Sequence, residues 1–398
     1  MIRLISISLF VLTTMHVASA GAISPASAKT DRPKDIYLAI RTDGLTGSGT
    51  KYDPYDGSTA TKLDNVLRTI SNGSTVHFGP GTFQSAGFQN NSESSGFYVK
   101  PMCHYLGAGR NRTTIKVVAA TNNGHFACAF CSPGTNADVS GSSVESMTID
   151  MNGAALVAAN GVDLKTYGVS LPGRNNTIRN VHLIHMYGHE ATGAEAFGLG
   201  VCRSASNAMP SGNLIEDCLV DTFATGNDYG QMICIGGGIA HDNWVIGQVT
   251  NTSAYQAYGA NAILDRCYAR NCRTFLYMDE GDVGPLTVKN CRAWGITNAF
   301  INLAPSAGFT HHDVRVMNNK VEFGPTGTFF NAFAGGTGAR LYNIRIVNNS
   351  AAQMFGIYSP FNISQVHNFH SSGNSWIKTG ASREKRLRER PATARAHL

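Results

Sequence analysis

A short pattern recurs along the chain from about residue 140 onward, and it constrains the fold more than any other feature of the sequence. An apolar and a variable residue alternate twice, then comes Asn or Asp, and then a small or apolar residue. The copies are 177–181, 214–218, 287–291, 316–320 and 346–350, with 263–267 placing Arg266 in the polar position. They start about 24 to 49 residues apart, which is the spacing of solenoid coils that carry loops of variable length.

A second set of short segments lies between these copies, and each predicts a β-strand bounded by Gly, Pro or Asn. The segments are 126–130, 167–171, 197–201, 232–235, 275–278, 300–303, 329–333 and 355–358. Two kinds of strand that alternate at constant phase place equivalent residues above one another, so that neighbouring coils bury each other's apolar faces. A β-sandwich also has many short strands, but it would show two-residue Asn-Gly or Asp-Gly turns between them. The corners and longer loops of this chain favour a parallel β-helix.

Stacking of equivalent residues also explains the polar positions of the pattern. A buried Asn carries donors and an acceptor that a like residue one coil away can satisfy. Gly and Asn at the corners adopt the left-handed dihedral angles that sharp bends require. Cys218, Cys267 and Cys291 share one position of the repeat, and we expect a column of small, buried, unreactive thiols there rather than disulfides.

The remaining cysteines give no metal site. Nine cysteines are an odd number, so they cannot all pair within one molecule. Cys128 and Cys131 have the spacing of a metal-binding pair, but no second pair accompanies them. Since alternate residues of a strand face opposite sides, we also expect these two side chains to point apart. Zinc is therefore not expected.

The open end of a solenoid needs a cover, and the segment 59–70 predicts a capping helix. Its apolar residues Leu63, Val66, Leu67 and Ile70 fall at helical spacing, and Thr59 or the preceding serine can cap it. Residues 75–78 then predict the first strand. The expected organisation is a signal peptide (1–20), a linker (21–36), the cap and first coil (37–95), the β-helix (96–377) and a basic tail (378–398).

Both ends of the chain have a distinct composition. The N-terminal segment predicts a secretory signal, because it has a positive residue, a short apolar run and a small-residue cleavage site before Gly21. The apolar run is too short to span a bilayer, so we expect a secreted protein without a membrane span. Residues 381–398 carry six Lys or Arg against two Glu, so most of the net charge of +6 lies in a tail that we expect to be solvated. The nearly neutral body gives no nucleic-acid footprint.

The N-terminal part resembles a known family. Asp43-Gly44, Asp53-Pro54 and the segments 56–59 and 75–83 resemble the N-terminal block of bacterial pectate-lyase-like β-helix proteins. The resemblance spans about forty residues. It implies an all-β fold, a right-handed single-stranded parallel β-helix with a short N-terminal capping helix, usually exported and often active on polysaccharides. The chain lacks the Arg-x-Pro-x-x-Arg pattern of pectate lyases and the motif set of polygalacturonases, so neither activity follows.

The best candidate for catalysis is an acidic segment after a predicted strand in the middle of the helix. Asp279, Glu280 and Asp282 place three carboxylates within four residues, next to Tyr277. Two such groups can act on a glycosidic bond. Carboxyl groups about 5–5.5 Å apart are typical of hydrolases that retain the anomeric configuration, and groups about 6.5–9.5 Å apart are typical of hydrolases that invert it. Alternatively they can hold Ca²⁺, which assists β-elimination of a uronate. A polar turn without a chemical role is the third interpretation.

A second candidate cluster carries histidines around a Gly-rich strand. A His beside a carboxylate can act as a general base near neutral pH, as His189 and His241 are placed to do. His182 and His185 cannot share a strand face, which argues against a metal pair there. A solvated or stacked structural His is the alternative in each case. We assign substrate binding to four residues: His189, Arg203, His241 and Tyr277.

Two hypotheses about function follow from the sequence. The first is an exported polysaccharide lyase or glycoside hydrolase that binds a glycan along the outer face of the helix, with Ca²⁺ as a cofactor only if it is a lyase. The second is a non-catalytic glycan-binding or surface-structural β-helix. Exposed aromatics that can stack on sugar rings are Tyr229, Tyr255 and Tyr258, with loop packing as their alternative role. Substrate, bond broken and oligomeric state stay open.

Overall fold

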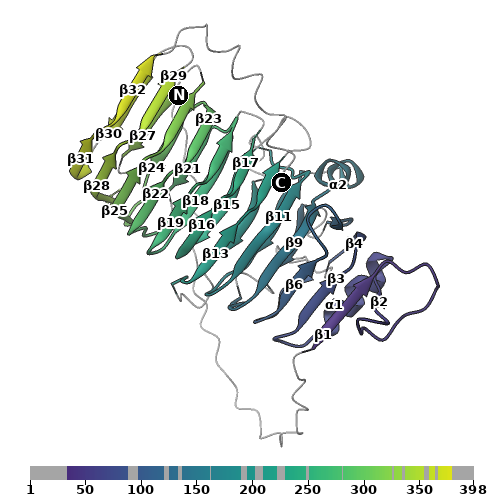
Figure 1. Cartoon of the computed structure of the whole chain (residues 1–398). Helices are drawn as coiled ribbons and strands as arrows, with labels where there is room; N and C mark the ends of the chain where they lie inside the picture. Colours follow the sequence, from purple (N-terminus) through teal and green to yellow (C-terminus); the bar gives the residue numbers. More distant parts are fainter. Residues whose placement is uncertain are drawn as a thin grey trace, which may run out of the picture. The chain divides into compact units, whose positions relative to one another are not determined.

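Every strand pairing among the described residues is parallel, and each strand pairs with the strands one coil before and one coil after it (Figure 1). The computed structural model describes residues 34–87, 97–120, 125–132, 137–161, 163–189, 195–201, 209–221, 229–247, 251–279, 281–324, 327–333, 337–353, 358–363 and 366–378. The expected signal segment and nearly all of the basic tail lie outside these ranges. No helix among the described residues is long and apolar enough to cross a membrane.

One side of the coils is a ten-stranded sheet, called sheet B here. Its strands follow one another in chain order because each coil contributes one of them. They are β5 (Phe97–Tyr98), β8 (Phe126–Cys131), β10 (Lys165–Ser170), β12 (Ala196–Val201), β15 (Tyr229–Gly236), β18 (Asn251–Tyr258), β21 (Thr274–Met278), β24 (Ala299–Leu303), β27 (Gly327–Ala332) and β30 (Tyr358–Ile363).

The rest of each coil belongs to a 22-stranded sheet, called sheet A here, to which most coils contribute two strands on either side of a sharp corner or one continuous strand that crosses it. The strands are β1 (Asp35–Ala39), β2 (Tyr55–Asp56), β3 (Thr75–Phe78), β4 (Gly81–Ser85), β6 (His104–Gly107), β7 (Thr113–Val117), β9 (Ser143–Asp150), β11 (Thr177–Ile184), β13 (Asn213–Glu216), β14 (Leu219–Asp221), β16 (Gly238–His241), β17 (Trp244–Ile246), β19 (Ala262–Asp265), β20 (Tyr268–Arg270), β22 (Leu286–Lys289), β23 (Arg292–Ile296), β25 (Thr310–Met317), β26 (Lys320–Phe323), β28 (Arg340–Val347), β29 (Ser350–Gln353), β31 (Val366–Ser372) and β32 (Ser375–Lys378).

The recurring Asn or Asp of the sequence pattern forms the corner in sheet A. One residue per coil adopts a left-handed conformation there, with φ between 49° and 58°. Asn and Asp tolerate this conformation because their short polar side chains hydrogen-bond locally, so the predicted role of the pattern is confirmed. The corner residues are Ser146, Asn180, Asp217, Asp242, Arg266, Asn290, Asn318 and Asn348.

The residue after each corner points into the core and forms a second column. Its members are Met147, Val181, Cys218, Asn243, Cys267, Cys291, Asn319 and Asn349. Within this column Asn319 donates from Nδ2 to Oδ1 of Asn349 over 2.9 Å. The three thiols are free and buried, as predicted, and burial raises the pKa of Cys218 to about 12. The windows 214–218, 287–291 and 316–320 align Asn319 with Asp217 and Asn290, and this alignment is wrong by one position: Asn318 occupies the corner, and the amide of Asn319 lies inside.

The strands of sheet B bend. The bend is visible as two consecutive residues of a strand that both face the core. Phe275 and Leu276 are both fully buried, and the pattern repeats one coil later at Phe300 and Ile301. In β8 the same bend turns Ala129 and Phe130 inward and leaves the cysteines before and after them on the outer face, where they pair as a disulfide. The expectation that Cys128 and Cys131 point apart is therefore wrong, because strict alternation fails at the bend.

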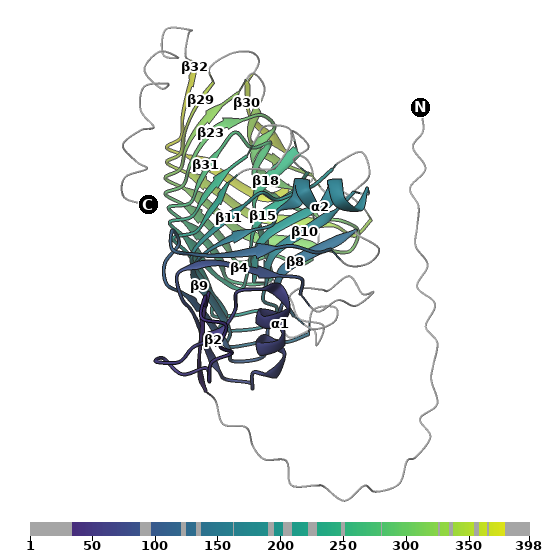
Figure 2. The same ribbon diagram turned by 90° about the vertical axis from the view of Figure 1, so that its right-hand side faces the viewer.

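The N-terminal end of the coils is covered by helix α1 (Ala60–Thr69), as predicted (Figure 2). The hydroxyl of Thr59 accepts a hydrogen bond from the Lys62 amide over 3.3 Å, and Leu63 and Leu67 are buried against the first coils. The strand at 75–78 is present as β3, but it is not the first, because β1 pairs with both β2 and β3. A second short helix, α2 (Gly153–Asn160), lies between β9 and β10.

Candidate functional site

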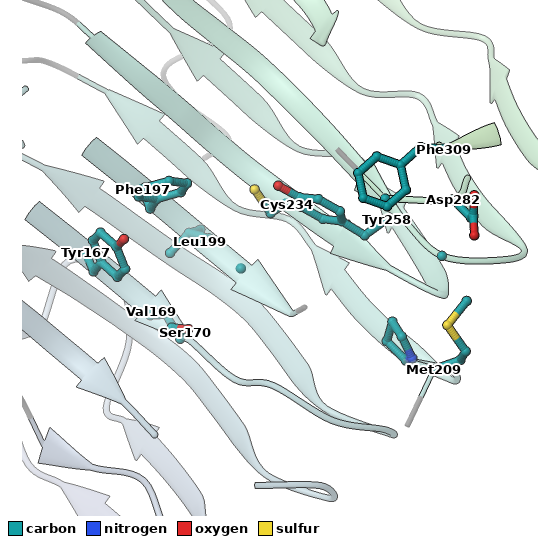
Figure 3. Close-up of a pocket in the computed structure, with 15 residues that line it drawn as sticks. Tyr167, Val169, Ser170, Phe197, Leu199, Met209, Cys234, Tyr258, Asp282 and Phe309 are labelled. Atoms are coloured by element: carbon teal, nitrogen blue, oxygen red, sulfur yellow. The ribbon is translucent and has the colours of Figure 1, made fainter. Parts of the chain in front are cut away.

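A groove of about 500 Å³ lies on the outer face of sheet B, across β10, β12, β15 and the end of β18 (Figure 3). Tyr167 and Phe197 stand on one side of it, with ring centroids 4.7 Å apart and an angle of 65° between the rings. Tyr258, Phe309 and Asp282 stand on the other side. The groove is thus walled by aromatic rings contributed by different coils.

The floor is low because one outward column carries small residues. Ser170, Gly200 and Cys234 are paired across β10, β12 and β15, so their side chains lie above one another on the outer face. The aromatic column, by contrast, lies three residues earlier in each strand. The bend in sheet B brings both columns to the same face, and the small side chains leave the space between the aromatic walls open.

Two glycines of β12 have different reasons to be there. A Cβ at Gly198 would lie 2.0 Å from the carbonyl oxygen of Met232, so the close approach of two coils excludes any side chain. A Cβ at Gly200 would meet only Val169 and Cys234, each at 3.6 Å, which is an ordinary contact, and Gly200 does not have the left-handed conformation. The backbone would accept a side chain at Gly200, which would then project into the groove.

The rim on the Asp282 side is fixed by hydrogen bonds between coils. Oδ1 of Asp282 accepts from the Thr310 amide over 2.8 Å, and the Gly284 amide donates to the carbonyl of Gly259 over 3.2 Å. These bonds hold the Asp282 carboxylate at the edge of the groove rather than leaving it on a free loop. A preorganised carboxylate can accept hydrogen bonds from hydroxyl groups or take part in proton transfer.

A buried histidine lies directly behind this rim. His311 is fully buried at the start of β25, in register with Val283 and Leu341, and neither ring nitrogen has a partner among the described residues. Burial lowers its pKa to about 4, although the backbone of Gly281 and the charge of Asp282 act in the opposite direction. The ring is therefore neutral at ordinary pH and faces the core rather than the groove.

The predicted acidic segment is only partly assembled in the groove. Asp282 lines it, whereas Asp279 follows the end of β21, half-buried, with its carbonyl accepting from the Ser306 amide over 2.8 Å. Tyr277 is half-buried in β21, in register with Asn302, and does not line the groove. Glu280 lies outside the described residues. Of the three carboxylates predicted to act together, Asp282 is the one that lines the groove among the described residues.

His189 belongs to a different cluster at the other end of the sheet B strands. Its Nδ1 lies 3.1 Å from Oδ1 of Asp163, which also accepts from the Tyr187 hydroxyl over 2.8 Å. Burial and the hydrogen bond to Asp163 raise the pKa of Tyr187 to about 12. The arrangement orients the imidazole through a carboxylate, as in a general base, but neither His189 nor Asp163 is among the residues that line the groove.

His241 lies in β16 of sheet A, so the structure separates it from Asp282. Its Nε2 is 2.9 Å from Oε2 of Glu216, and its Nδ1 is 2.8 Å from Oδ2 of Asp242. Arg266 binds both oxygens of Asp242 and lowers the pKa of that carboxyl group. His241 therefore sits in a column of ion pairs that crosses successive coils.

The other predicted residues divide between core, groove and undescribed chain. Tyr258 lines the groove beside Asp282, as a sugar-stacking role would require. Tyr255 was expected to be exposed, which is wrong: it is fully buried, and its hydroxyl donates to main-chain carbonyls of sheet A. Arg203 and the side chain of Tyr229 lie outside the described part of the chain. Among the described residues, no three His, Cys, Asp or Glu side chains gather closely enough to hold a metal ion.

Sequence reasoning missed most of the groove. Tyr167 and Phe197 were recognised only as the first residues of predicted strands. A usable signal was present, because an aromatic residue is followed three positions later by a small one in two successive coils, Tyr167 with Ser170 and Phe197 with Gly200. Met209 and Phe309 come from distant loops and carry no such periodic signal.

Two solved structures resemble this chain closely enough to establish its fold. Endo-xylogalacturonan hydrolase from Aspergillus tubingensis has a TM-score of 0.55 at 13% identity, covering 86% of this chain and 93% of its own. The tailspike protein of E. coli bacteriophage HK620, in complex with a pentasaccharide, has a TM-score of 0.53 at 12% identity, covering 81% of this chain and 63% of its own. No protein-family model and no curated protein matches the sequence. The likeness confirms a right-handed parallel β-helix.

Proposed function

We propose that this protein, a right-handed parallel β-helix of the pectate-lyase-like type, binds a polysaccharide in the groove on sheet B. The observation that carries the proposal is the combination of aromatic walls with one fixed carboxylate. Tyr167, Phe197 and Tyr258 offer apolar ring surface for the C–H faces of sugars, while Asp282 accepts hydrogen bonds from hydroxyl groups. An open groove across several coils suits a chain-like ligand better than a compact one.

The structural neighbours support the same proposal. Of the two neighbours named above, one is an endo-xylogalacturonan hydrolase, and the other was solved with a bound pentasaccharide. At 12–13% identity these likenesses establish only the fold, so the groove itself is the principal support.

Removal of one aromatic wall tests the proposal. Phe197→Ala is expected to weaken binding of a recognised polysaccharide by about tenfold, because a stacked aromatic contributes on the order of 1 kcal/mol beyond its buried area. Affinity electrophoresis against a panel of soluble polysaccharides measures this. Tyr52→Ala is the control, since Tyr52 is 95% exposed and lies outside the groove. Equal retardation of the wild type and Phe197→Ala on every polysaccharide would contradict the proposal.

Cleavage of the bound glycan is a second candidate function, favoured by the acidic turn that carries Asp282. We propose that Asp282 acts with Asp279 or Glu280 as a pair of catalytic carboxylates in a hydrolase or lyase. Asp282→Asn is then expected to lower kcat at least a hundredfold while affinity changes only a few-fold. New reducing ends without ultraviolet absorbance indicate hydrolysis, and an absorbing unsaturated product that disappears with EDTA indicates Ca²⁺-assisted elimination.

Comparison of variants separates catalysis from binding alone. Asp279→Asn and Glu280→Gln identify the second carboxylate, and thermal unfolding of each variant checks that the turn is intact. Saturable binding with no product under any pH or metal condition would leave a non-catalytic glycan-binding protein. We also propose that the chain is exported, which N-terminal sequencing of secreted protein tests: a start near Gly21 is expected.

A further inference from the structure

The described surface of the groove combines apolar walls with a single acidic group. Of the fifteen residues that line it, Asp282 is the only Asp, Glu, Lys or Arg. Phe197, Tyr258 and Phe309 give the walls their apolar character. The Asp282 carboxylate is held at the rim by the Thr310 amide, so it cannot turn away from a ligand without losing a hydrogen bond.

This arrangement favours uncharged sugars over anionic ones. The carboxylate of a uronate or a sulfate group would be repelled by Asp282 and would lose hydration against the aromatic walls. A neutral sugar meets neither cost, because its hydroxyl groups can donate to Asp282 and its C–H faces can pack on the rings. We propose that the groove selects an uncharged sugar unit and that Gly200 sets the size of the unit it admits; this rests on the proposed glycan-binding function and, of the two reactions considered there, is compatible with hydrolysis but not with elimination of a uronate.

The role of Gly200 follows from the space around it. The backbone there tolerates a side chain, since a Cβ would make only ordinary contacts with Val169 and Cys234, whereas Gly198 could not accept one. Nothing in the main-chain geometry of β12 therefore requires glycine at position 200. A glycine at this point instead keeps the floor open between Ser170 and Cys234, its partners in the neighbouring strands.

Two substitutions at Gly200 test the size of the groove. Gly200→Phe is expected to fill it and weaken binding at least tenfold, and Gly200→Ser, which repeats the residue one coil earlier, is expected to weaken binding a few-fold. Gly324→Phe is the matched control, because a Cβ at Gly324 also meets neighbours only at 3.4 Å or more and this glycine does not line the groove. Thermal unfolding establishes that each variant folds, and Gly200→Ser keeps the test usable if the larger side chain does not.

Charge selectivity is tested by calorimetry with two families of probes. Neutral xylo-, gluco- and manno-oligosaccharides are compared with oligogalacturonate and oligomannuronate, each in 20 mM and 500 mM NaCl. We expect at least one neutral family to bind with a Kd that changes less than twofold with salt, since no ligand charge is screened. Asp282→Asn should weaken that binding a few-fold, and the uronate probes should not bind.

The outcomes distinguish this inference from the proposed function. Tight binding of a uronate probe that Gly200→Phe abolishes and Asp282→Asn strengthens would overturn the neutral class while leaving the groove as the glycan site. Binding of any saccharide that survives Gly200→Phe unchanged, or no binding of any polysaccharide at all, would instead contradict the proposed function itself.

Discussion

Single residues carry the chemistry of this β-helix, and their position relative to the wall of the helix decides their role. Asp282 and His311 are separated by one hydrogen-bonded step between coils, yet the carboxylate lies in the groove and the imidazole lies in the core. Groups outside the wall can meet a ligand, whereas groups inside it can influence only stability.

A single residue should make the stability of the fold sensitive to acid, because His311 must become charged as the pH falls. Its pKa is about 4 in the folded chain against 6.5 in the unfolded chain, so the unfolded state binds more protons between these values and stability rises with pH across that window. The free energy of unfolding is not reduced by His311 above pH 6.5, where the ring is neutral in both states. By pH 4 the protonation of His311 in the unfolded chain lowers the free energy of unfolding by about 3 kcal/mol. Urea unfolding of the wild type at pH 7, 5.5 and 4 measures the loss.

His311→Leu isolates this effect from the carboxylates that titrate in the same range. Leucine suits the neighbourhood of Val283 and Leu341 and cannot be protonated. The difference in unfolding free energy between the wild type and His311→Leu should therefore grow as pH falls. A difference that stays constant from pH 7 to pH 4 would show that His311 is not the titrating group.

At the scale of an element, the corner of sheet A shows how one sequence pattern serves two purposes. The corner residue satisfies the backbone conformation, and where the residue after it is Asn, its side chain satisfies buried polar groups of the preceding coil. Oδ1 of Asn319 accepts from the Cys291 amide over 2.8 Å, and its Nδ2 donates to the Val288 carbonyl over 3.0 Å. The amide column thus supplies hydrogen bonds that the sheets cannot supply at their corners.

Substitutions at adjacent positions should separate these purposes. Asn319→Ala leaves several buried partners unsatisfied and is expected to lower the free energy of unfolding by about 3 kcal/mol. Asn318→Gly keeps a residue that adopts the left-handed φ of 57° without strain, so it should change stability by less than about 0.5 kcal/mol. Denaturant titrations of both variants make the comparison, and equal effects would refute separate roles for the two asparagines.

At the scale of the whole molecule, one continuous core runs through the stacked coils from Ile36 to Ala351. Each coil depends on its neighbours, so the exposed first coil is the place where the stack needs protection. Helix α1 and strands β1 and β2 supply it, and Leu63, Leu67 and Ile70 close the apolar end.

Removal of this cap should therefore affect the solution behaviour of the entire chain. A variant that begins at Ser74 exposes the pairing edge of β3 and the apolar end of the core, and it is expected to aggregate. Size-exclusion chromatography compares it with a chain that begins at Gly21, the expected mature start. A monodisperse truncated chain with unchanged thermal unfolding would mean that α1, β1 and β2 do not protect the stack.

The sequence by itself determined the features that repeat. The polar corner positions, the buried thiols at Cys218, Cys267 and Cys291, and the capping helix after Thr59 each depend on local conformation or on one residue type per coil, so they are visible as a pattern. The acidic segment was also visible, because its charges are adjacent in the chain.

Only the tertiary structure decided which of these residues meet. The bend in sheet B breaks strict alternation, so it places Cys128 with Cys131 and the Tyr167 column with the Gly200 column on one face, which a two-residue period does not predict. The register between coils places Asp282 and Tyr258 beside Phe309 in the groove, whereas His241 lies in sheet A. The physical reason is that the groove arises from contacts between coils, whose distances in sequence vary with loop length.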